Sequence, residues 1–166
     1  MKKLLFVLCM ILLSCAGFSQ EVSSKELVLW NNAMYMQKLY VSFKTIKVDG
    51  VETRDTTVTF FARNQKYLAL SQTFMVNSCS KEEFAKFVDD VKSFYYDKKD
   101  VIENNMNEKK YLDINKEFSV SILKQYGVLG IEIKRGEDYH SFRCAQLMKI
   151  FDKYMDWYNK ENKVKK

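Results

Sequence analysis

The stretch SKEEFAKFVDDVKSFYYDKKDVIENN, residues 80–105, decides the fold class, because it predicts a long helix between two groups of strand-like segments. Ser80 and Glu83 have the spacing of a capping box, in which each side chain accepts a hydrogen bond from the other's backbone N–H. The apolar positions that follow recur at helical spacing and predict one buried face, made of Phe84, Phe87, Val88, Val91, Tyr95 and Ile102. We expect this helix to end near Asn104.

Upstream of this helix, the sequence predicts an antiparallel meander. Apolar and polar residues alternate over 39–46, and a β-branched run over 53–62 follows a turn at Gly50. A third strand is expected over 66–74. Residues 21–35 fit either a short helix or an extended segment, and the pattern leaves this choice open.

Downstream of the helix, residues 104–115 are polar and are interpreted as a connection. Three further strands are expected over 118–122, 128–134 and 139–142, followed by a second helix over 143–160. The core stripe expected on this second helix consists of Leu147, Phe151, Tyr154, Met155 and Tyr158, widened by Ile150 and Trp157.

These elements predict an α+β fold, an antiparallel β-meander sheet with two helices on one face, in the element order β-β-β-α-β-β-β-α. The 166-residue chain contains no proline and no Gly/Ser-rich segment, so no flexible linker is expected. The sequence therefore predicts a single globular α+β domain over residues 20–166, with a short basic C-terminal tail.

The N-terminus has the pattern of a bacterial secretory signal peptide. Lys2–Lys3 give a positively charged start, and the uncharged apolar run Leu4–Leu13 follows. This run is too short to cross a bilayer, which takes about 20 residues. Small residues at Gly17 and Ser19 fit a cleavage site. We therefore expect a signal peptide over 1–19 and a mature protein in the periplasm, the outer membrane or the extracellular space.

A second interpretation of the export signal rests on one cysteine. The segment Leu12-Leu13-Ser14-Cys15 resembles the lipobox of bacterial lipoproteins, in which the cysteine is diacylated and becomes the mature N-terminus. The resemblance implies a lipid anchor at Cys15, and simple cleavage after Ser19 remains the alternative. Contact with a membrane is expected only through this anchor.

Two cysteines, Cys79 and Cys144, remain in the mature domain, and each is expected at the start of a helix. Export favours disulfide formation, so a Cys79–Cys144 bridge is predicted if the two helix starts are adjacent. The loop closed would span about 65 residues and stabilise the fold by about 4 kcal/mol in the chain-entropy model. Two buried free thiols are the alternative.

The sequence contains no catalytic or metal-binding motif, so no catalytic residue, metal or cofactor is predicted. The one histidine, His140, is expected at the surface or at a strand edge. Tyr96 falls on the polar side of the first helix and is a candidate for a contact surface.

The net charge of +6 is mild and scattered, and no basic-aromatic motif for nucleic acid is present, so nucleic acid is excluded as a partner. We expect an exported, non-enzymatic small domain of the bacterial envelope or secreted fraction that binds a protein, glycan or lipid partner. Two alternatives stay open: a carboxylate-dependent hydrolase of envelope or extracellular polymer, and a small inhibitor or chaperone-like protein with an uncovered apolar sheet face.

Overall fold

The computed structural model describes residues 21–105, 109–115, 118–125 and 127–163. The predicted signal peptide over 1–19, the candidate lipidation site Cys15 and the last lysines of the basic tail, Lys165 and Lys166, lie outside the described residues.

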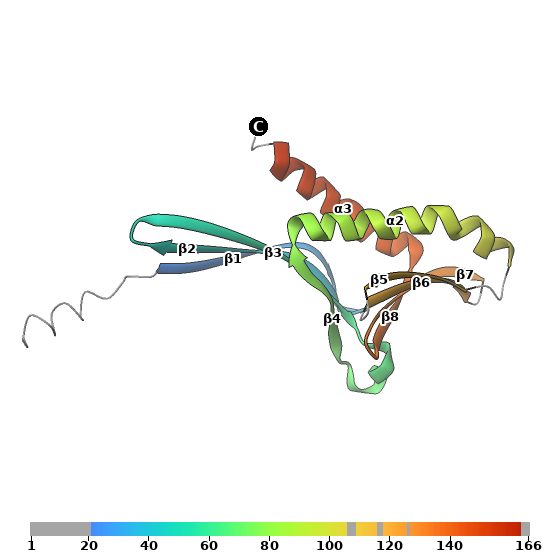
Figure 1. Ribbon diagram of the computed structural model, residues 1–166. Helices are drawn as coiled ribbons and strands as arrows, with labels where there is room; N and C mark the ends of the chain where they lie inside the picture. Colours follow the sequence, from blue (N-terminus) through green and yellow to red (C-terminus); the bar gives the residue numbers. More distant parts are fainter. Residues whose placement is uncertain (1–20, 106–108, 116–117, 126, 164–166) are drawn as a thin grey trace, which may run out of the picture. The chain divides into compact units, whose positions relative to one another are not determined.

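Over the described residues, the structure is α+β, with two four-stranded antiparallel sheets and two long helices (Figure 1). Strands are hydrogen-bonded in chain order within each sheet, as in a meander. The elements are β1 (Glu21–Asn32), β2 (Gln37–Val48), β3 (Val51–Arg63), the 3-10 segment η1 (Gln65–Leu70), β4 (Thr73–Ser80), α2 (Lys81–Asn104), β5 (Lys109–Asn115), β6 (Phe118–Gln125), β7 (Val128–Arg135), β8 (Asp138–Arg143) and α3 (Cys144–Lys163).

The predicted α+β fold class is confirmed. The predicted element order is also confirmed: a meander is followed by a helix, and then a second meander is followed by a second helix. Each meander has one strand more than expected, β1 in the first and β5 in the second. The sequence left open whether this region is a short helix or an extended segment, and residues 21–32 are extended. The polar stretch 109–115 is a strand because it lies at the edge of its sheet, where a polar strand is tolerated.

The strand predicted over 66–74 is wrong. The Asn64 side chain accepts a hydrogen bond from the backbone N–H of Lys66 at 3.0 Å, which turns the chain away from the sheet into η1. The segment closes where Asn64 N–H donates to the Gln72 carbonyl at 2.7 Å, next to Ser71 with its φ of +49°. The chain returns to the sheet only at Thr73, as β4.

The internal contacts of the chain divide it into two compact units, and the prediction of a single domain stays a prediction. The described part of the smaller unit consists of residues 21–25 and 43–55, which include the turn between β2 and β3. Asp49 and Gly50 both have positive φ there, so the predicted turn is confirmed. The larger unit comprises residues 26–42 and 56–166 and contains both helices and the whole second sheet.

Both helices pack against the second sheet, and the core lies between this sheet and the helices (Figure 1). In register, Val120 faces Ile133 and Ile131 faces Phe142, and all four are buried. The Phe87 ring of α2 packs edge-on against Phe118 of β6 and against Phe151 of α3. Alternation along the strands thus gives one apolar face for the helices.

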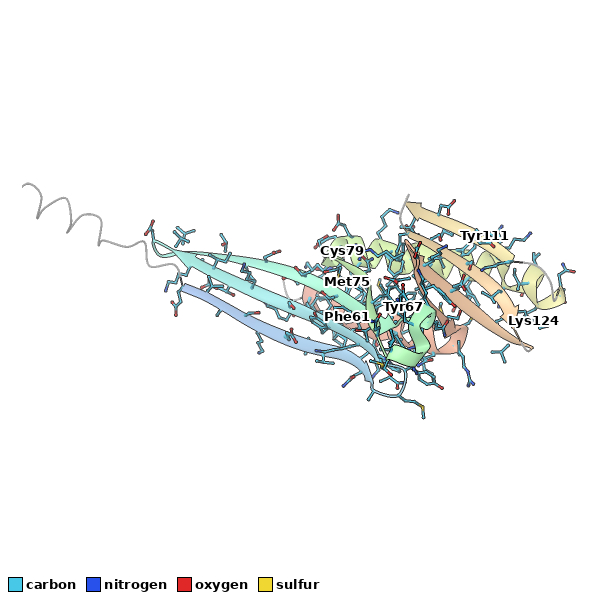
Figure 2. The ribbon with its side chains drawn as sticks, turned by 90° about the horizontal axis from the view of Figure 1, so that it is seen from below. Phe61, Tyr67, Met75, Cys79, Tyr111 and Lys124 are labelled. Atoms are coloured by element: carbon cyan, nitrogen blue, oxygen red, sulfur yellow. The ribbon has the colours of Figure 1, made fainter. Side chains whose placement is uncertain are left out.

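The opposite face of the second sheet is polar. Lys109 Nζ lies 2.8 Å from Glu132 Oε1, and Ser121 Oγ donates to the same carboxylate at 3.4 Å. Tyr111 of β5, labelled in Figure 2, is exposed, and Lys109 lies over its ring. This sheet therefore has no uncovered apolar face among its described residues.

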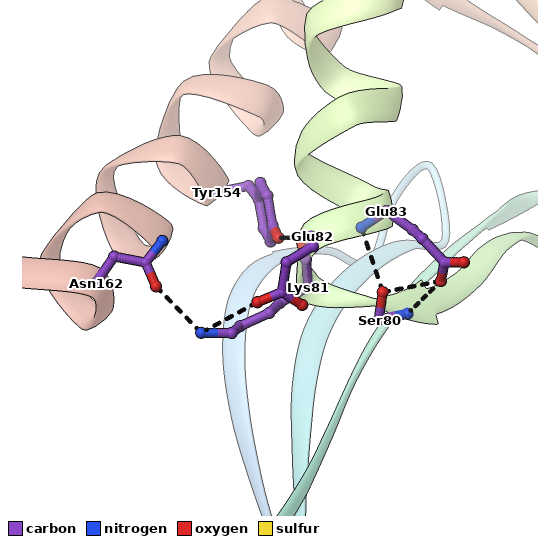
Figure 3. A network of polar contacts seen from close by, with 6 residues as sticks. All are labelled: Ser80, Lys81, Glu82, Glu83, Tyr154 and Asn162. Carbon is purple, nitrogen blue, oxygen red and sulfur yellow. Dashed lines mark hydrogen bonds and ion pairs between the residues drawn. The ribbon is translucent and has the colours of Figure 1, made fainter. Parts of the chain in front are cut away.

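The two helices are antiparallel. The start of α2 contacts the second half of α3, where Tyr154 Oη donates to the Lys81 carbonyl and Lys81 Nζ donates to Asn162 Oδ1 (Figure 3). Further along, Lys92 of α2 pairs with Asp152 of α3 at 2.7 Å. The start of α3 therefore lies beside the second half of α2.

Candidate binding site

An open hollow of about 370 Å³ lies beside the start of α3, and its lining combines aromatic rings with basic side chains. We call it the basic hollow, and its lining residues are Trp30, Asn32, Tyr35, Arg143, Ala145, Gln146 and Lys149. All of them belong to the larger compact unit. Small-molecule sites have volumes of about 300–1,000 Å³, so the hollow has room for a small ligand.

The end of β1 and the turn that follows place the two aromatic rings. Trp30 lies two residues before the last residue of β1, Asn32. The Asn32 Oδ1 accepts a hydrogen bond from the backbone N–H of Tyr35 at 3.4 Å, and Met36 adopts a φ of +48°, so the chain reverses tightly. Tyr35 remains 42% exposed. Its ring is therefore accessible to a ligand.

The first turns of α3 supply the polar side of the basic hollow. Gln146, Lys149 and Lys153 are three or four residues apart, so they follow one face of the helix. The Lys153 Nζ lies 5.2 Å from the centre of the Trp30 ring, within the range of a cation–π contact. Arg143 directly precedes the helix. Three cations thus gather around two aromatic rings.

The charge at the basic hollow is unbalanced. Arg143 and Lys149 are exposed, and within the described ranges neither forms an ion pair. None of the lining residues is acidic, and neither is any residue in the first turn of α3. The partial positive charge of the helix N-terminus therefore adds to the three cations. This arrangement can attract an anion.

The wall residue Gln146 is linked to a buried histidine by a chain of hydrogen bonds. Gln146 Nε2 donates to Gln37 Oε1 at 2.8 Å, and Gln37 Nε2 lies 3.2 Å from His140 Nε2. On its other side, His140 Nδ1 lies 2.7 Å from the Arg63 carbonyl oxygen. A carbonyl oxygen only accepts, so Nδ1 carries a proton. The neutral imidazole then accepts from Gln37 at Nε2.

His140 is only 3% exposed, so the expected surface position is wrong, although its strand β8 is a sheet edge as predicted. It lies opposite Ile133 and on the same side of β8 as Phe142, which places it on the face covered by the helices. Burial lowers the pKa of His140, partly offset by the hydrogen bond to the Arg63 carbonyl. The alternation of residues along β8 could by itself have predicted that His140 lies on the covered face of the sheet.

A second open hollow, of about 540 Å³, lies at the turn between β7 and β8. Its charged groups already have partners within the fold. Arg135 Nη1 donates to the Met75 carbonyl at 3.2 Å, and Asp138 Oδ1 accepts from Asn64 Nδ2 at 2.6 Å. Met75 is labelled in Figure 2. This hollow therefore offers less unpaired charge to a ligand than the basic hollow.

The predicted disulfide between Cys79 and Cys144 is not formed, and both residues are free thiols. Cys79 precedes the start of α2, which contacts Tyr154, whereas Cys144 is the first residue of α3. Ten helical residues separate Cys144 from Tyr154, about 15 Å along the axis. A disulfide needs Cα atoms within about 7 Å. The bridge is absent because antiparallel helices put their starts at opposite ends.

Both thiols have the character of structural cysteines. Burial, with a smaller effect of Glu83, raises the pKa of Cys79 to about 11. Burial raises the pKa of Cys144 to about 12. A thiol is nucleophilic and binds metals only as the thiolate. At neutral pH neither cysteine therefore provides a reactive group.

Tyr96, the candidate contact residue, is 55% exposed on α2, as its position in the polar arc predicted. Its ring contacts Tyr95 edge-on, and Lys99 lies over it at 5.7 Å. It belongs to neither hollow. Its role in binding stays a prediction.

The two hollows contain no pair of carboxylates. The basic hollow has none, and the second hollow has only Asp138. Among the described carboxylates, a pKa shift is resolved for Glu83 and Glu137, and hydrogen bonds to Ser80 and to Lys66, respectively, lower both values. A general acid needs a raised pKa. Over the same described residues, no cluster of three or more potential metal ligands occurs, and no helix is long and apolar enough to span a membrane.

Comparison of the chain with protein-family models, with curated proteins and with solved structures finds no match. The residues themselves therefore carry the functional argument.

Proposed function

We propose that this protein is an exported, non-enzymatic binding domain whose basic hollow holds an acidic glycan. The observation that carries the proposal is the gathering of two aromatic side chains and three cations around one open hollow that has no acidic residue in its lining. Such a site combines an apolar surface with a few converging charged groups, as ligand sites do.

Among protein, glycan and lipid partners, an acidic glycan suits this site best. A sugar ring has an apolar face that can pack on Trp30 or Tyr35, and its carboxylate or sulfate can pair with Arg143 or Lys149. A volume of about 370 Å³ accepts one or two sugar units. A stable protein partner needs a buried area above about 1,000 Å², and an acyl chain needs an enclosed apolar cavity.

An unsatisfied donor also lies at this site. The Trp30 Nε1–H is buried and has no acceptor within the described part of the chain. Buried polar groups in native proteins are nearly always hydrogen-bonded, so such a group needs an explanation. Because this atom is closed to solvent, an oxygen atom of a glycan or of a water molecule would reach it only after the Trp30 ring turns.

The export part of the proposal rests on the sequence alone. The lysines at positions 2 and 3, the short apolar run after them and the small residues before Gln20 support a signal peptide over 1–19. The location that follows is the periplasm, the outer membrane or the extracellular space, where acidic glycans occur. Intact mass spectrometry of the mature protein would distinguish cleavage after Ser19 from diacylation at Cys15.

The binding experiment measures the affinity of the purified protein for dextran sulfate and for unmodified dextran. We expect binding of the sulfated polymer only, weakening as salt is added. Arg143→Gln and Lys149→Gln should each lower the affinity about two- to fivefold, the range for an exposed ion pair. Tyr35→Ala should lower it through loss of the ring, and this exposed residue can be removed with little effect on the core.

Lys160→Gln is the matched control. Lys160 is exposed on the same helix, about three turns beyond Lys149, and it lies outside the basic hollow. The same charge is removed, but the affinity should stay unchanged. An equal loss in Lys149→Gln and Lys160→Gln would show that net charge, and not the basic hollow, binds the polymer.

The hydrolase alternative gains no support from the described residues. A hydrolase needs two converging carboxylates, and neither hollow contains such a pair. A chaperone-like function needs an uncovered apolar sheet face. The outer face of the second sheet is polar and holds Lys109, Glu132 and Ser121. In the first sheet, the edge strand β1 exposes Val22, Leu27 and Val28, so this alternative stays open.

A further inference from the structure

The basic hollow has one neutral polar side chain whose hydrogen-bonding direction is fixed from inside the protein. Gln146 lines the hollow, and its Nε2 donates to Gln37 Oε1 at 2.8 Å. The Gln146 Oε1 has no hydrogen-bond partner among the described residues, so it is left for a ligand, together with the second N–H of Nε2. This oxygen only accepts hydrogen bonds.

The Arg63 carbonyl fixes this direction through three linked residues. Because a carbonyl cannot donate, His140 Nδ1 donates to it and the neutral His140 Nε2 must accept. Gln37 must then present its Nε2 to His140 and its Oε1 to Gln146. Each amide has one possible orientation as long as the imidazole is neutral.

We infer that His140 is a positioning residue for the basic hollow, which through Gln37 makes Gln146 an acceptor at neutral pH and a donor when the imidazole is protonated. The inference rests on the proposed function, and it deepens it in two ways. At neutral pH the preferred glycan carries a hydroxyl donor beside its acidic group. At acid pH the hollow gains a hydrogen-bond donor for that acidic group.

The reversal follows from the same chain of contacts. A protonated His140 donates from both nitrogens, so Gln37 must turn its Oε1 toward Nε2. Gln37 Nε2 then faces Gln146, which must turn its own Oε1 inward and its Nε2 toward the hollow. Since all three side chains are held in the larger unit, the change needs only two amide rotations.

Two charged residues and two neutral amides bear on the protonation of His140. Arg63, at the end of β3, disfavours a second positive charge, and Asp138 of β8 is already hydrogen-bonded to Asn64. Gln37 of β2 and Gln146 of α3 are neutral. The chain contains no other histidine, so no second imidazole titrates between pH 5 and 8.

The relay is tested first without a ligand, by NMR of the ¹⁵N-labelled protein between pH 8 and 5. We expect the ring nitrogens of His140 to show the Nδ1–H tautomer at pH 8. The side-chain amide signals of Gln37 and Gln146 should shift with the same midpoint as the ring, and the Gln146 signals are identified by their loss in Gln146→Met. An Nε2–H tautomer overturns the inference, and so does a ring that stays neutral to pH 5 or titrates without moving the amides.

The effect on binding is tested with dextran sulfate, whose sulfate esters stay ionised throughout this range. Below the midpoint of the ring, the affinity of the wild-type protein should rise about tenfold, the effect of one added charge-assisted hydrogen bond. Gln146→Met should bind the polymer with an affinity that no longer changes with pH. Gln72→Met, a control at an exposed glutamine outside the hollow, should keep the rise.

The two proposals fail in different ways. If dextran sulfate binds but Gln146→Met retains the full rise in affinity, the relay is overturned and the proposed function stands. If the polymer does not bind at either pH, the proposed function is overturned, and the NMR titration alone then decides whether the relay exists.

Discussion

At the scale of single residues, buried polar groups find partners far away in the sequence. Tyr154 is fully buried among aromatic rings, 4.6 Å from the Phe84 ring centre, yet its hydroxyl donates to the Lys81 carbonyl at the start of the other helix. Tyr96, by contrast, is more than half exposed. Comparing the two tyrosines therefore distinguishes the effect of a buried hydroxyl on stability from the effect of an exposed hydroxyl.

Tyr154→Phe should keep the ring packing and lose only the hydrogen bond. Because Tyr154 is fully buried, we expect the free energy of unfolding to fall by about 1 kcal/mol. Urea denaturation measures this difference, and Tyr96→Phe serves as the control with no expected change. A Tyr154→Phe protein as stable as the wild type would mean that the hydroxyl contributes nothing to joining the helices.

At the scale of elements, the two helices begin differently. Ser80 Oγ accepts from the Glu83 N–H at 3.3 Å, and Glu83 Oε2 accepts from the Ser80 N–H at 3.0 Å, which confirms the predicted capping box (Figure 3). The helix α3 follows β8 directly, with Arg143 ahead of it and no acid in its first turn. One helix start is closed by its own side chains, and the other adjoins the basic hollow.

Ser80→Ala should destabilise the protein by about 1 kcal/mol, the usual effect of losing an N-cap side chain. The hydrogen bond from Ser80 also lowers the pKa of Glu83, so its contribution is present above the ordinary glutamate pKa and disappears as the pH falls through the folded value. Ser80→Ala should therefore also flatten the acid side of the stability profile. Ser93→Ala, at an exposed position within α2, should leave both the stability and its dependence on acid pH unchanged.

The sequence could predict those elements whose structure is decided by residues that are neighbours in the chain. The helix over 81–104 follows from its cap and its spacing, which neighbouring residues decide. The strand at 109–115 was missed because pairing with β6, and not its own polar residues, makes it a strand. The basic hollow was not predictable, because Trp30 and Gln146 come from opposite ends of the chain and only the fold brings them together.

At the scale of the whole molecule, His140 joins elements from both halves of the chain. Its ring contacts Gln37 of β2 and the Arg63 carbonyl of β3, and it packs on Phe142, 4.4 Å away between ring centres. Phe142 in turn packs on Phe60 of β3. The first and second meanders therefore meet around one neutral imidazole.

This imidazole should make stability depend on pH. Burial lowers the pKa of His140 in the folded state, so the unfolded chain takes up a proton near pH 6.5 that the folded protein does not. The stabilisation is complete above that pH and is lost as the pH falls toward the folded value. Urea denaturation at pH 7.5 and 5.5 should show this loss, and His140→Gln should remove it. A ring titration midpoint above 6.5 in the folded protein would contradict the argument.

Stability should also differ between the two compact units. In the smaller unit, residues 21–25 and 43–55 include no buried residue, whereas Val120, Ile122 and Ile131 of the larger unit are fully buried. Local opening is easiest where few apolar contacts are lost. Hydrogen exchange should therefore be fast for the backbone amides of 44–54 and should require global unfolding for those of β6 and β7. Equal protection would mean that the 43–55 hairpin is covered in solution, and protection that rises with protein concentration would identify a second copy of the chain as the cover.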